Sequence, residues 1–299
     1  MSQPTFGWIV QTIARENARL ETLYDDNARY IEQLGDPFTT LWFDDHFQKT
    51  NSPILESWTS LCYFAARYPE FMFGTLVLSH SYRNPALTAK MMATIQFLTG
   101  GRYIAGIGAG WKEDEYQAYG YPFPSGKVRL EELEETAQIF RLMWSQSPAT
   151  FEGKHYVIRN ADCEPLPQTP IPLLIGGGGE KVTLRLVARY ADWFNVTFTD
   201  PDAYARKLEV LKQNCAEIGR DYEAITKSLW AYINFNNGNQ QVYDQYGRFI
   251  VSGTPEQVTE TLRRYVAMGC SHFMLRFGDY PQTEMLETFK QQVVPELRS

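Results

Sequence analysis

The sequence predicts a (β/α)8 barrel, the α/β fold in which eight parallel strands alternate with helices and close into a cylinder. Short β-rich runs alternate with helical patterns along the whole chain, and eight such runs occur in 299 residues. Most of these runs are apolar on consecutive residues, as expected for parallel strands that are covered on both faces. A doubly wound open sheet is the alternative, but eight regular units favour closure.

The expected strands are short runs of residues that favour β-structure. In chain order they span residues 5–10, 39–46, 71–78, 102–110, 171–177, 193–197, 227–235 and 271–277. Because the strands are parallel and the helices lie between them, the segments that follow each strand should meet at one end of the barrel. In such barrels this C-terminal end is the catalytic face.

Two of the intervening helices have clear signals. Residues 127–144 carry apolar side chains at spacings of three and four, which form one stripe. Its members are Leu130, Leu133, Ala137, Phe140 and Trp144. A second helix is expected over residues 254–269, where Thr254 is a good N-cap, Gln257 can close a capping box and Gly269 suits the C-terminal end. Its expected buried face consists of Val258, Leu262, Tyr265 and Val266.

Two stretches do not fit the repeat. Residues 145–170 contain several prolines, and residues 234–252 contain the run NNGNQQ. We interpret both as insertions into a single domain over residues 1–299, since insertions near the C-terminal ends of barrel strands usually shape the substrate pocket.

The composition excludes several classes of protein. With 28 Lys and Arg against 35 Asp and Glu, the net charge is −7, which argues against nucleic acid as a partner. No uncharged apolar run approaches the ~18 residues of a membrane span. The start of the chain lacks the basic and apolar stretches of an export signal, so we expect a cytoplasmic protein.

The cysteines and histidines do not form metal or disulfide motifs. Cys62, Cys163, Cys215 and Cys270 are widely scattered with no CxxC, which is typical of idle thiols in the cytoplasm. His46, His80, His155 and His272 show no HExxH or paired spacing, so no metal site is expected.

Two glycine-containing segments imitate nucleotide motifs but fail in detail. GIGAGW follows a strand, yet Trp111 stands where a dinucleotide fingerprint needs glycine. GYPFPSGKV places Gly120 one position too far from Gly126 for a phosphate-binding P-loop, and Val128 cannot ligate Mg²⁺. We therefore reject both readings.

The run Gly176, Gly177, Gly178, Gly179 predicts a phosphate site. It ends an apolar strand and opens a helical pattern, so unpaired backbone N–H groups and a partial positive charge would face a phosphate. Lys181 and Arg185 are the candidate cations. The alternative is a turn that binds nothing.

Acidic, histidine and aromatic residues follow the second and fourth strands. Asp44, Asp45 and His46 lie at the end of the second strand, where a histidine can transfer protons near neutral pH beside a carboxylate that sets its tautomer. The alternative is a loop histidine with capping aspartates.

Trp111 comes directly after the fourth strand and could either wall a flat ring or simply pack. Glu113 is expected to be solvated, whereas Asp114 and Glu115 stay open. Arg276, inside the eighth strand, could point into the barrel mouth or form an outer salt bridge.

Taken with these segments, the sequence resembles the luciferase-like superfamily, and within it the oxidoreductases that use the deazaflavin coenzyme F420. The resemblance covers almost the whole chain. It rests on the blocks WFDDHFQ, GTLVLSHSYRNPALTAK, GGRYIAGIGAGWKEDEYQAYGYPF, IPLLIGGGGEKVTLRLVARYADWFN and GTPEQVTETLRRYVAMGCSHFMLRFGD.

The resemblance implies a TIM barrel with insertions that binds coenzyme F420 at its mouth, and assigns the residues of the site. His46 corresponds to the proton-transferring histidine. The Leu76–Val77 peptide bond corresponds to a non-proline cis bond behind the ring. Cofactor contacts are implied for Asp45, Leu76, Val77, Ser79, Trp111, Asp114, Gly176, Gly177, Gly178, Gly179 and, as the local cation, Lys181. Similar barrels are usually homodimers.

The chain departs from the sugar-phosphate dehydrogenase branch at two positions. That branch has a glutamate where Trp111 stands and a tryptophan where Thr50 stands. Both differences count against glucose 6-phosphate as the substrate.

Three hypotheses follow. The first is an F420-dependent oxidoreductase that transfers a hydride between deazaflavin C5 and a small organic substrate, with His46 as proton donor or acceptor. The second is an FMNH₂-dependent monooxygenase on the same barrel, with FMN as the cofactor. The third is a non-catalytic flavin-binding paralogue, which would keep the glycine run but tolerate loss of His46.

Overall fold

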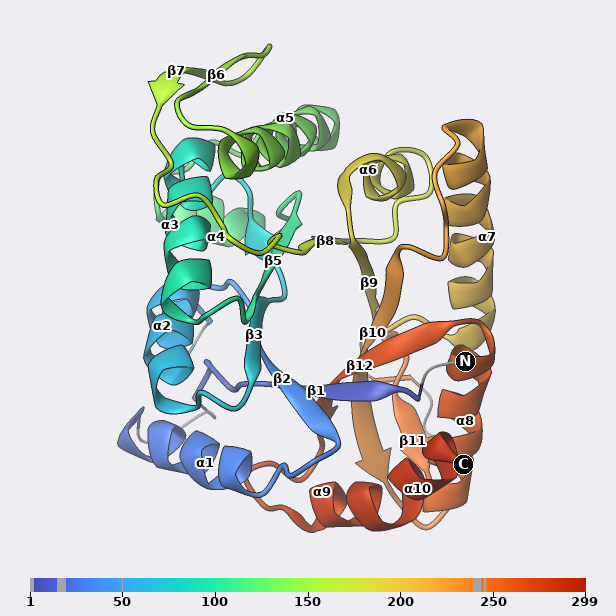
Figure 1. The fold of residues 1–299 in the computed structure, drawn as a ribbon. Helices are drawn as coiled ribbons and strands as arrows, with labels where there is room; N and C mark the ends of the chain where they lie inside the picture. The colour runs from blue at the N-terminus through green and yellow to red at the C-terminus, as the bar shows by residue number, and fades with distance from the viewer. Residues whose placement is uncertain (1–2, 15–19, 50, 239–242, 245) are drawn as a thin grey trace.

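The computed structural model describes residues 3–14, 20–49, 51–238, 243–244 and 246–299. Strands occupy the centre of the molecule and helices surround them (Figure 1). The barrel strands are β1 (Thr5–Ile9), β2 (Phe38–Phe43), β3 (Met72–Thr75) with β4 (Leu78–Ser79), β5 (Tyr103–Gly108), β8 (Leu173–Gly176), β9 (Trp193–Thr197), β10 (Thr226–Phe235) and β12 (Cys270–Phe277).

These strands form a closed parallel barrel. Each pairs in parallel with its neighbours in the order β1, β2, β3 with β4, β5, β8, β9, β10 and β12, and β12 pairs with β1. The prediction of eight strands and of a closed (β/α)8 barrel is confirmed. The third strand is interrupted between β3 and β4, where the Leu76–Val77 peptide bond is cis, as the resemblance implied.

The helices lie outside the strands. They are α1 (Leu20–Glu32), α2 (Ser57–Arg67), α3 (Pro85–Leu98), α4 (Glu113–Ala118), α5 (Gly126–Ser145), α6 (Thr183–Tyr190), α7 (Pro201–Glu217), α8 (Pro255–Ala267), α9 (Glu284–Thr288), the π-helix η1 (Phe289–Val293) and α10 (Val294–Arg298). The predicted capping box of α8 is present between Thr254 and Gln257. In the part of the chain that is described, no helix combines the length and apolar character needed to cross a membrane.

The two predicted insertions carry small strands. Residues 145–170 contain the antiparallel hairpin of β6 (Ala149–Glu152) and β7 (Val157–Ala161). Residues 234–252 lead into β11 (Val251–Gly253), which pairs with β10. The second half of the NNGNQQ run, residues 239–241, lies outside the described residues, as does Thr50.

Large side chains close the interior of the barrel. Ile9, Trp42, Ile104, Leu174 and Met274 belong to one fully buried cluster inside the cylinder. Gly7 and Gly74 make room for the indole of Trp42, because a Cβ atom at either position would lie within 2.3 Å of it. Since the interior is filled, any ligand must bind at an end of the barrel.

Candidate functional site

A cavity of about 580 Å³ lies at the carboxyl ends of β2, β4, β5, β8 and β9. Most of the residues predicted for the site line it, although they come from distant parts of the chain. They are Asp45, His46, Leu76, Val77, Ser79, Trp111 and Gly176 to Gly179. These residues therefore meet at the carboxyl ends of the barrel strands, as the sequence predicted.

Asp114 and Lys181 do not line this cavity. The Asp114 side chain is 63% exposed and binds Lys112 at 2.8 Å. Lys181 is exposed, and so is Arg185, the other candidate cation. Both residues follow the glycine run in sequence. However, Lys181 lies in a turn at residues 180–182, and Arg185 lies on the exposed side of α6, which begins at Thr183.

The imidazole of His46 is held by Glu115, a residue whose role the sequence left open. His46 Nδ1 lies 3.2 Å from both carboxylate oxygens of Glu115. Glu115 is fully buried and also accepts hydrogen bonds from the backbone N–H of Phe47, at 3.0 Å, and from the Tyr82 hydroxyl, at 3.0 Å. With Nδ1 engaged, Nε2 is the ring atom left to exchange a proton in the cavity.

Opposing effects set the proton affinity of this pair. Burial by itself lowers the pKa of His46, but its hydrogen bond with Glu115 and the negative charges of Asp44 and Glu115 outweigh burial and raise it above the ordinary value. Burial raises the pKa of Glu115, yet its hydrogen bond with His46 and other donors lower it to about 2. The arrangement therefore favours an imidazolium beside a carboxylate.

The other histidines are placed differently. His272 lies inside the barrel, where Trp42 Nε1 donates to it at 3.1 Å, and burial lowers its pKa to about 3. Burial and the charge of Arg129 lower the pKa of His80 to about 4. Neither lines the cavity, where His46 is the histidine among the lining residues.

Asp44 connects the His46 end of the cavity to Arg276. Arg276 Nη2 donates to Asp44 Oδ2 at 2.9 Å, and Thr12 Oγ1 donates to Asp44 Oδ1 at 2.8 Å. Burial opposes ionisation of Asp44, but Arg276 lowers its pKa overall. Of the two readings of Arg276 left open, the structure supports the one in which it points into the barrel mouth.

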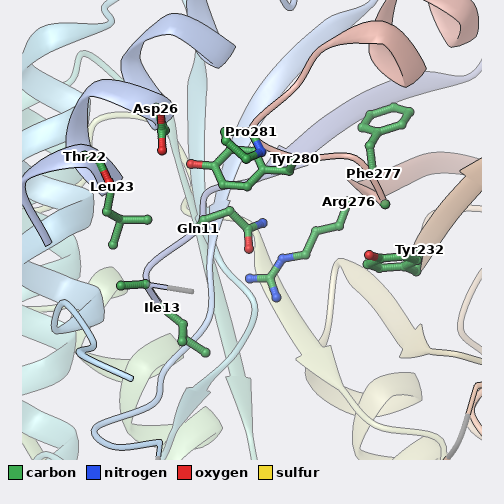
Figure 2. A pocket seen from close by; sticks show the side chains of 12 residues that line it. Gln11, Ile13, Thr22, Leu23, Asp26, Tyr232, Arg276, Phe277, Tyr280 and Pro281 are labelled. Atoms are coloured by element: carbon green, nitrogen blue, oxygen red, sulfur yellow. The ribbon is translucent and has the colours of Figure 1, made fainter. Parts of the chain in front are cut away.

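Arg276 itself lines a second, smaller cavity of about 150 Å³ at the ends of β1, β10 and β12. Figure 2 shows its guanidinium extending between Gln11 and Tyr232. The two cavities therefore lie at the ends of different barrel strands. Asp44 lines the larger cavity and Arg276 lines the smaller one, so their ion pair connects the two.

Asp45 and Ser79 tie the second strand to the third. Arg83 binds Asp45 through two hydrogen bonds of 3.1 and 3.2 Å, and the Ser79 backbone N–H donates to the same carboxylate at 3.0 Å. The Ser79 hydroxyl contacts the Tyr116 hydroxyl. These contacts fix the rim of the cavity around His46.

Val77 lies across the glycines of β5 and β8. A Cβ atom at Gly108 would approach Val77 Cγ2 to 2.7 Å, and one at Gly176 would approach Val77 Cγ1 to 2.9 Å. Gly108 of the GIGAG segment and Gly176 thus allow the backbone to pack closely against Val77. Val77 and bare backbone together give the cavity a floor without polar side chains.

The glycine run meets a lysine that sequence reasoning missed. Lys207, in the second turn of α7, donates from Nζ to the carbonyl of Gly178 at 2.7 Å. A Cβ atom at Gly178 would lie 2.8 Å from Lys207 Cε, and one at Gly179 would lie 2.8 Å from Thr183 Oγ1. One sequence signal could have identified it. Lys207 lies three residues after Tyr204 and four before Leu211, which places it on the same face of α7 as these two buried residues.

The donor set at this end suits a phosphate. It combines the backbone of the glycine run, the Thr183 hydroxyl at the first turn of α6 and the ammonium of Lys207, all of which line the cavity. The cavity therefore offers a set of anion-binding donors at one end, the apolar side chain of Val77 in the middle and the His46 imidazole at the other end. Among the described residues, no cluster of three potential metal ligands occurs.

Comparison with known proteins supports a common architecture. Residues 24–252 match the family described as luciferase-like monooxygenase. An F420-dependent glucose-6-phosphate dehydrogenase of Kineococcus radiotolerans is 28% identical, over 91% of this chain and 92% of the relative. An F420-dependent secondary alcohol dehydrogenase, solved with an F420–acetone adduct, superposes with a TM-score of 0.85 at 19% identity over the full length of both chains.

A second solved structure has the same fold. The F420-dependent tetrahydromethanopterin reductase from Methanopyrus kandleri superposes with a TM-score of 0.80 at 16% identity, over 99% of this chain and 100% of that chain. At these identities the two structural likenesses establish the barrel and its connectivity.

Proposed function

This chain belongs to the luciferase-like monooxygenase family. We propose that it is a coenzyme F420-dependent oxidoreductase built as a single barrel domain. The cofactor would exchange a hydride at C5 of its deazaflavin ring with an electrophilic carbon of a small organic substrate. One observation carries the proposal: a single cavity joins a phosphate cradle at Gly176 to Gly179 to the His46–Glu115 pair. The F420-dependent relative that aligns over most of this chain supports the choice of cofactor.

The residues on the cavity wall fit such a cofactor. The glycine run, Thr183 and Lys207 would bind its phosphate, and Val77 would support its flat ring from below. Asp45 and Ser79, held to each other by a hydrogen bond of 3.0 Å, would lie at the ring edge.

His46 would supply or accept the proton that accompanies the hydride. Its side chain is 23% exposed, so the ring can exchange protons with solvent between turnovers. The neighbouring Trp111 is 72% exposed, and its ring meets that of His46 edge-on with the centroids 5.7 Å apart. Trp111 is therefore placed to contact the substrate rather than to support the fold.

We propose a small substrate other than glucose 6-phosphate. Trp111 presents an apolar ring beside His46, where the sugar-phosphate dehydrogenases that this chain resembles have a carboxylate. Ketones, imines and activated alkenes carry the electrophilic carbon that hydride transfer requires.

We also propose a homodimer in the cytoplasm. Leu87 and Leu98 lie eleven residues apart on the outer face of α3 and are 56% and 71% exposed. Phe97 and Tyr63 are also more than half exposed on α3 and α2, so this side offers an apolar surface for a second copy. The four cysteines are free, which is typical of a reducing compartment.

The test of the proposed function is titration of the purified protein with both candidate cofactors. We expect the deazaflavin to bind at least tenfold more tightly than FMN, and the reduced, cofactor-loaded enzyme to stay reduced in air. Tighter binding of FMN, or substrate oxidation only with reduced FMN and oxygen, would establish the monooxygenase alternative instead. Sedimentation of the protein before and after Leu98→Asp tests the dimer.

A further inference from the structure

Glu115 is a fully buried carboxylate at the active-site end of the cavity, and five donors converge on it. They are His46 Nδ1, the backbone N–H groups of Phe47 and Gln48, the Tyr82 hydroxyl and the ammonium of Lys112, at distances of 3.0 to 3.2 Å. A buried carboxylate is costly unless it is paired and hydrogen-bonded, and this one is both. Its neighbours Glu113 and Asp114 are exposed, so the chain directs only one of three consecutive acids inward.

The contacts of Glu115 constrain His46 in two ways. The bonds from the Phe47 and Gln48 backbone fix the segment that carries the histidine. The contact of Nδ1 with both carboxylate oxygens fixes the ring itself, because a carboxylate accepts only from a protonated Nδ1. The ring is therefore oriented with Nδ1–H toward Glu115 and Nε2 toward the cavity.

The charges around the ring favour its protonated form. Glu115 on α4 and Asp44 at the end of β2 are negative, and Lys112 before α4 is the opposing positive charge. Asp44 is partly neutralised by Arg276, and Lys112 is shared with Asp114 at 2.8 Å. Glu115 contacts the ring directly, because both of its carboxylate oxygens lie 3.2 Å from Nδ1.

We propose that Glu115 is the positioning residue for proton transfer by His46, and that the pair sets the enzyme to reduce a C=O or C=N group at neutral pH. This inference rests on the proposed function. In the step, the carbon gains a hydride from the reduced deazaflavin while His46 Nε2 gives its proton to the oxygen or nitrogen, leaving a neutral imidazole. A proton from solvent then restores the imidazolium. Oxidation of an alcohol requires the neutral ring and is therefore favoured only at higher pH.

The experiment is a histidine NMR titration of the full-length protein. The His46 signal is assigned by its absence in His46→Asn, and its pKa is measured in the wild type, in Glu115→Gln and in the matched control Glu113→Gln. We expect a wild-type pKa above the ordinary 6.5, a fall of about one pH unit or more in Glu115→Gln, and no change in Glu113→Gln. The amide of Glu115→Gln keeps an acceptor for Nδ1–H but loses the charge, so its thermal unfolding should stay cooperative.

A second variant covers the case in which Glu115→Gln does not fold. Asp44→Asn removes the other negative charge near the ring and keeps the Nδ1 contact, so it should lower the His46 pKa by less than Glu115→Gln. If Glu115→Gln does not fold, a fall in Asp44→Asn together with a wild-type value above 6.5 supports the charge arrangement.

Two results would overturn the inference. The first is a wild-type His46 pKa below 6.5, which would remove the preference for reduction. The second is an unchanged His46 pKa in folded Glu115→Gln, or in Asp44→Asn if Glu115→Gln does not fold. That result would leave the carboxylates with a structural role only. The titration needs neither cofactor nor substrate. Failure to bind the deazaflavin would therefore sink the proposed function alone, and an unaltered titration would sink only this inference.

Discussion

Lys207 is the cation that the folded structure places at the glycine run, and its removal should weaken cofactor binding. The perturbation is Lys207→Met, which keeps the length of the aliphatic stem. A unit charge about 4 Å from an anion gains about 4 kcal/mol at an effective dielectric constant of ~20. The Lys207 side chain is 20% exposed and lies 3.7 Å from Glu180, so water and that carboxylate take part of the gain.

We therefore expect a loss of about 1.4–2.8 kcal/mol, which is a 10- to 100-fold rise in the Kd for the deazaflavin. The assay is titration of the cofactor's fluorescence at low and high salt, since screening should reduce the difference between the variants. Lys181→Met is the matched control, because Lys181 follows the glycine run in sequence but is exposed, and its effect should be below about twofold. Equal effects of the two substitutions, or an effect of Lys181 alone, would refute the assignment of Lys207.

Four further predictions concern the same cavity. His46→Ala should lower turnover by roughly 10²–10⁴-fold, the usual range for a general acid or base, with a much smaller change in cofactor Kd; unchanged turnover would remove it from the mechanism. Gly178→Asp should weaken cofactor binding by more than about tenfold, because the new side chain would collide with Lys207 and place a carboxylate against the phosphate. Calorimetry would measure the change, and an unaltered affinity would contradict phosphate binding at the glycine run. Because the pKa of His46 is raised in the folded state, its protonation should stabilise the fold fully below pH 6.5 and lose this effect as the pH rises through the folded-state pKa. The difference in the free energy of unfolding between wild type and His46→Asn, measured in urea, should therefore shrink with rising pH. Steady-state assays should give glucose 6-phosphate a kcat/KM at least about tenfold below that of the best small ketone, because Trp111 replaces a carboxylate; the reverse order would contradict this.

The fold could be predicted from sequence because its signals are local. Each barrel strand is a short apolar run, and the alternation with helices follows from chain order alone. The rule that functional residues gather at the carboxyl ends of the strands then placed His46, Ser79, Trp111 and the glycine run at one cavity.

The parts of the site that were missed depend on helix rotation and on distant packing. Successive residues of a helix differ by about 100° in direction, so an uncertainty of one position exchanges Asp114, which is exposed, for Glu115, which contacts His46. Lys181 and Lys207 differ in another way. Lys181 is close to the glycine run in sequence, whereas Lys207 reaches it only because α7 packs beside α6 in the folded barrel.

The glycines packed against Val77 show how one segment can require glycine at positions that are distant in sequence. Val77 occupies space that side chains at Gly108 and Gly176 would fill, and Gly106 faces the carbonyl of Thr75 at 1.9 Å from an added Cβ atom. These three glycines lie on β5 and β8, yet the reason for them lies at the end of β3 and in the segment that joins β3 to β4. Read within its own segment, GIGAG resembles a failed nucleotide motif. Within the barrel it lets the third strand approach its neighbours closely, and the cavity gains an apolar floor on which a flat ring can lie between the phosphate cradle and His46.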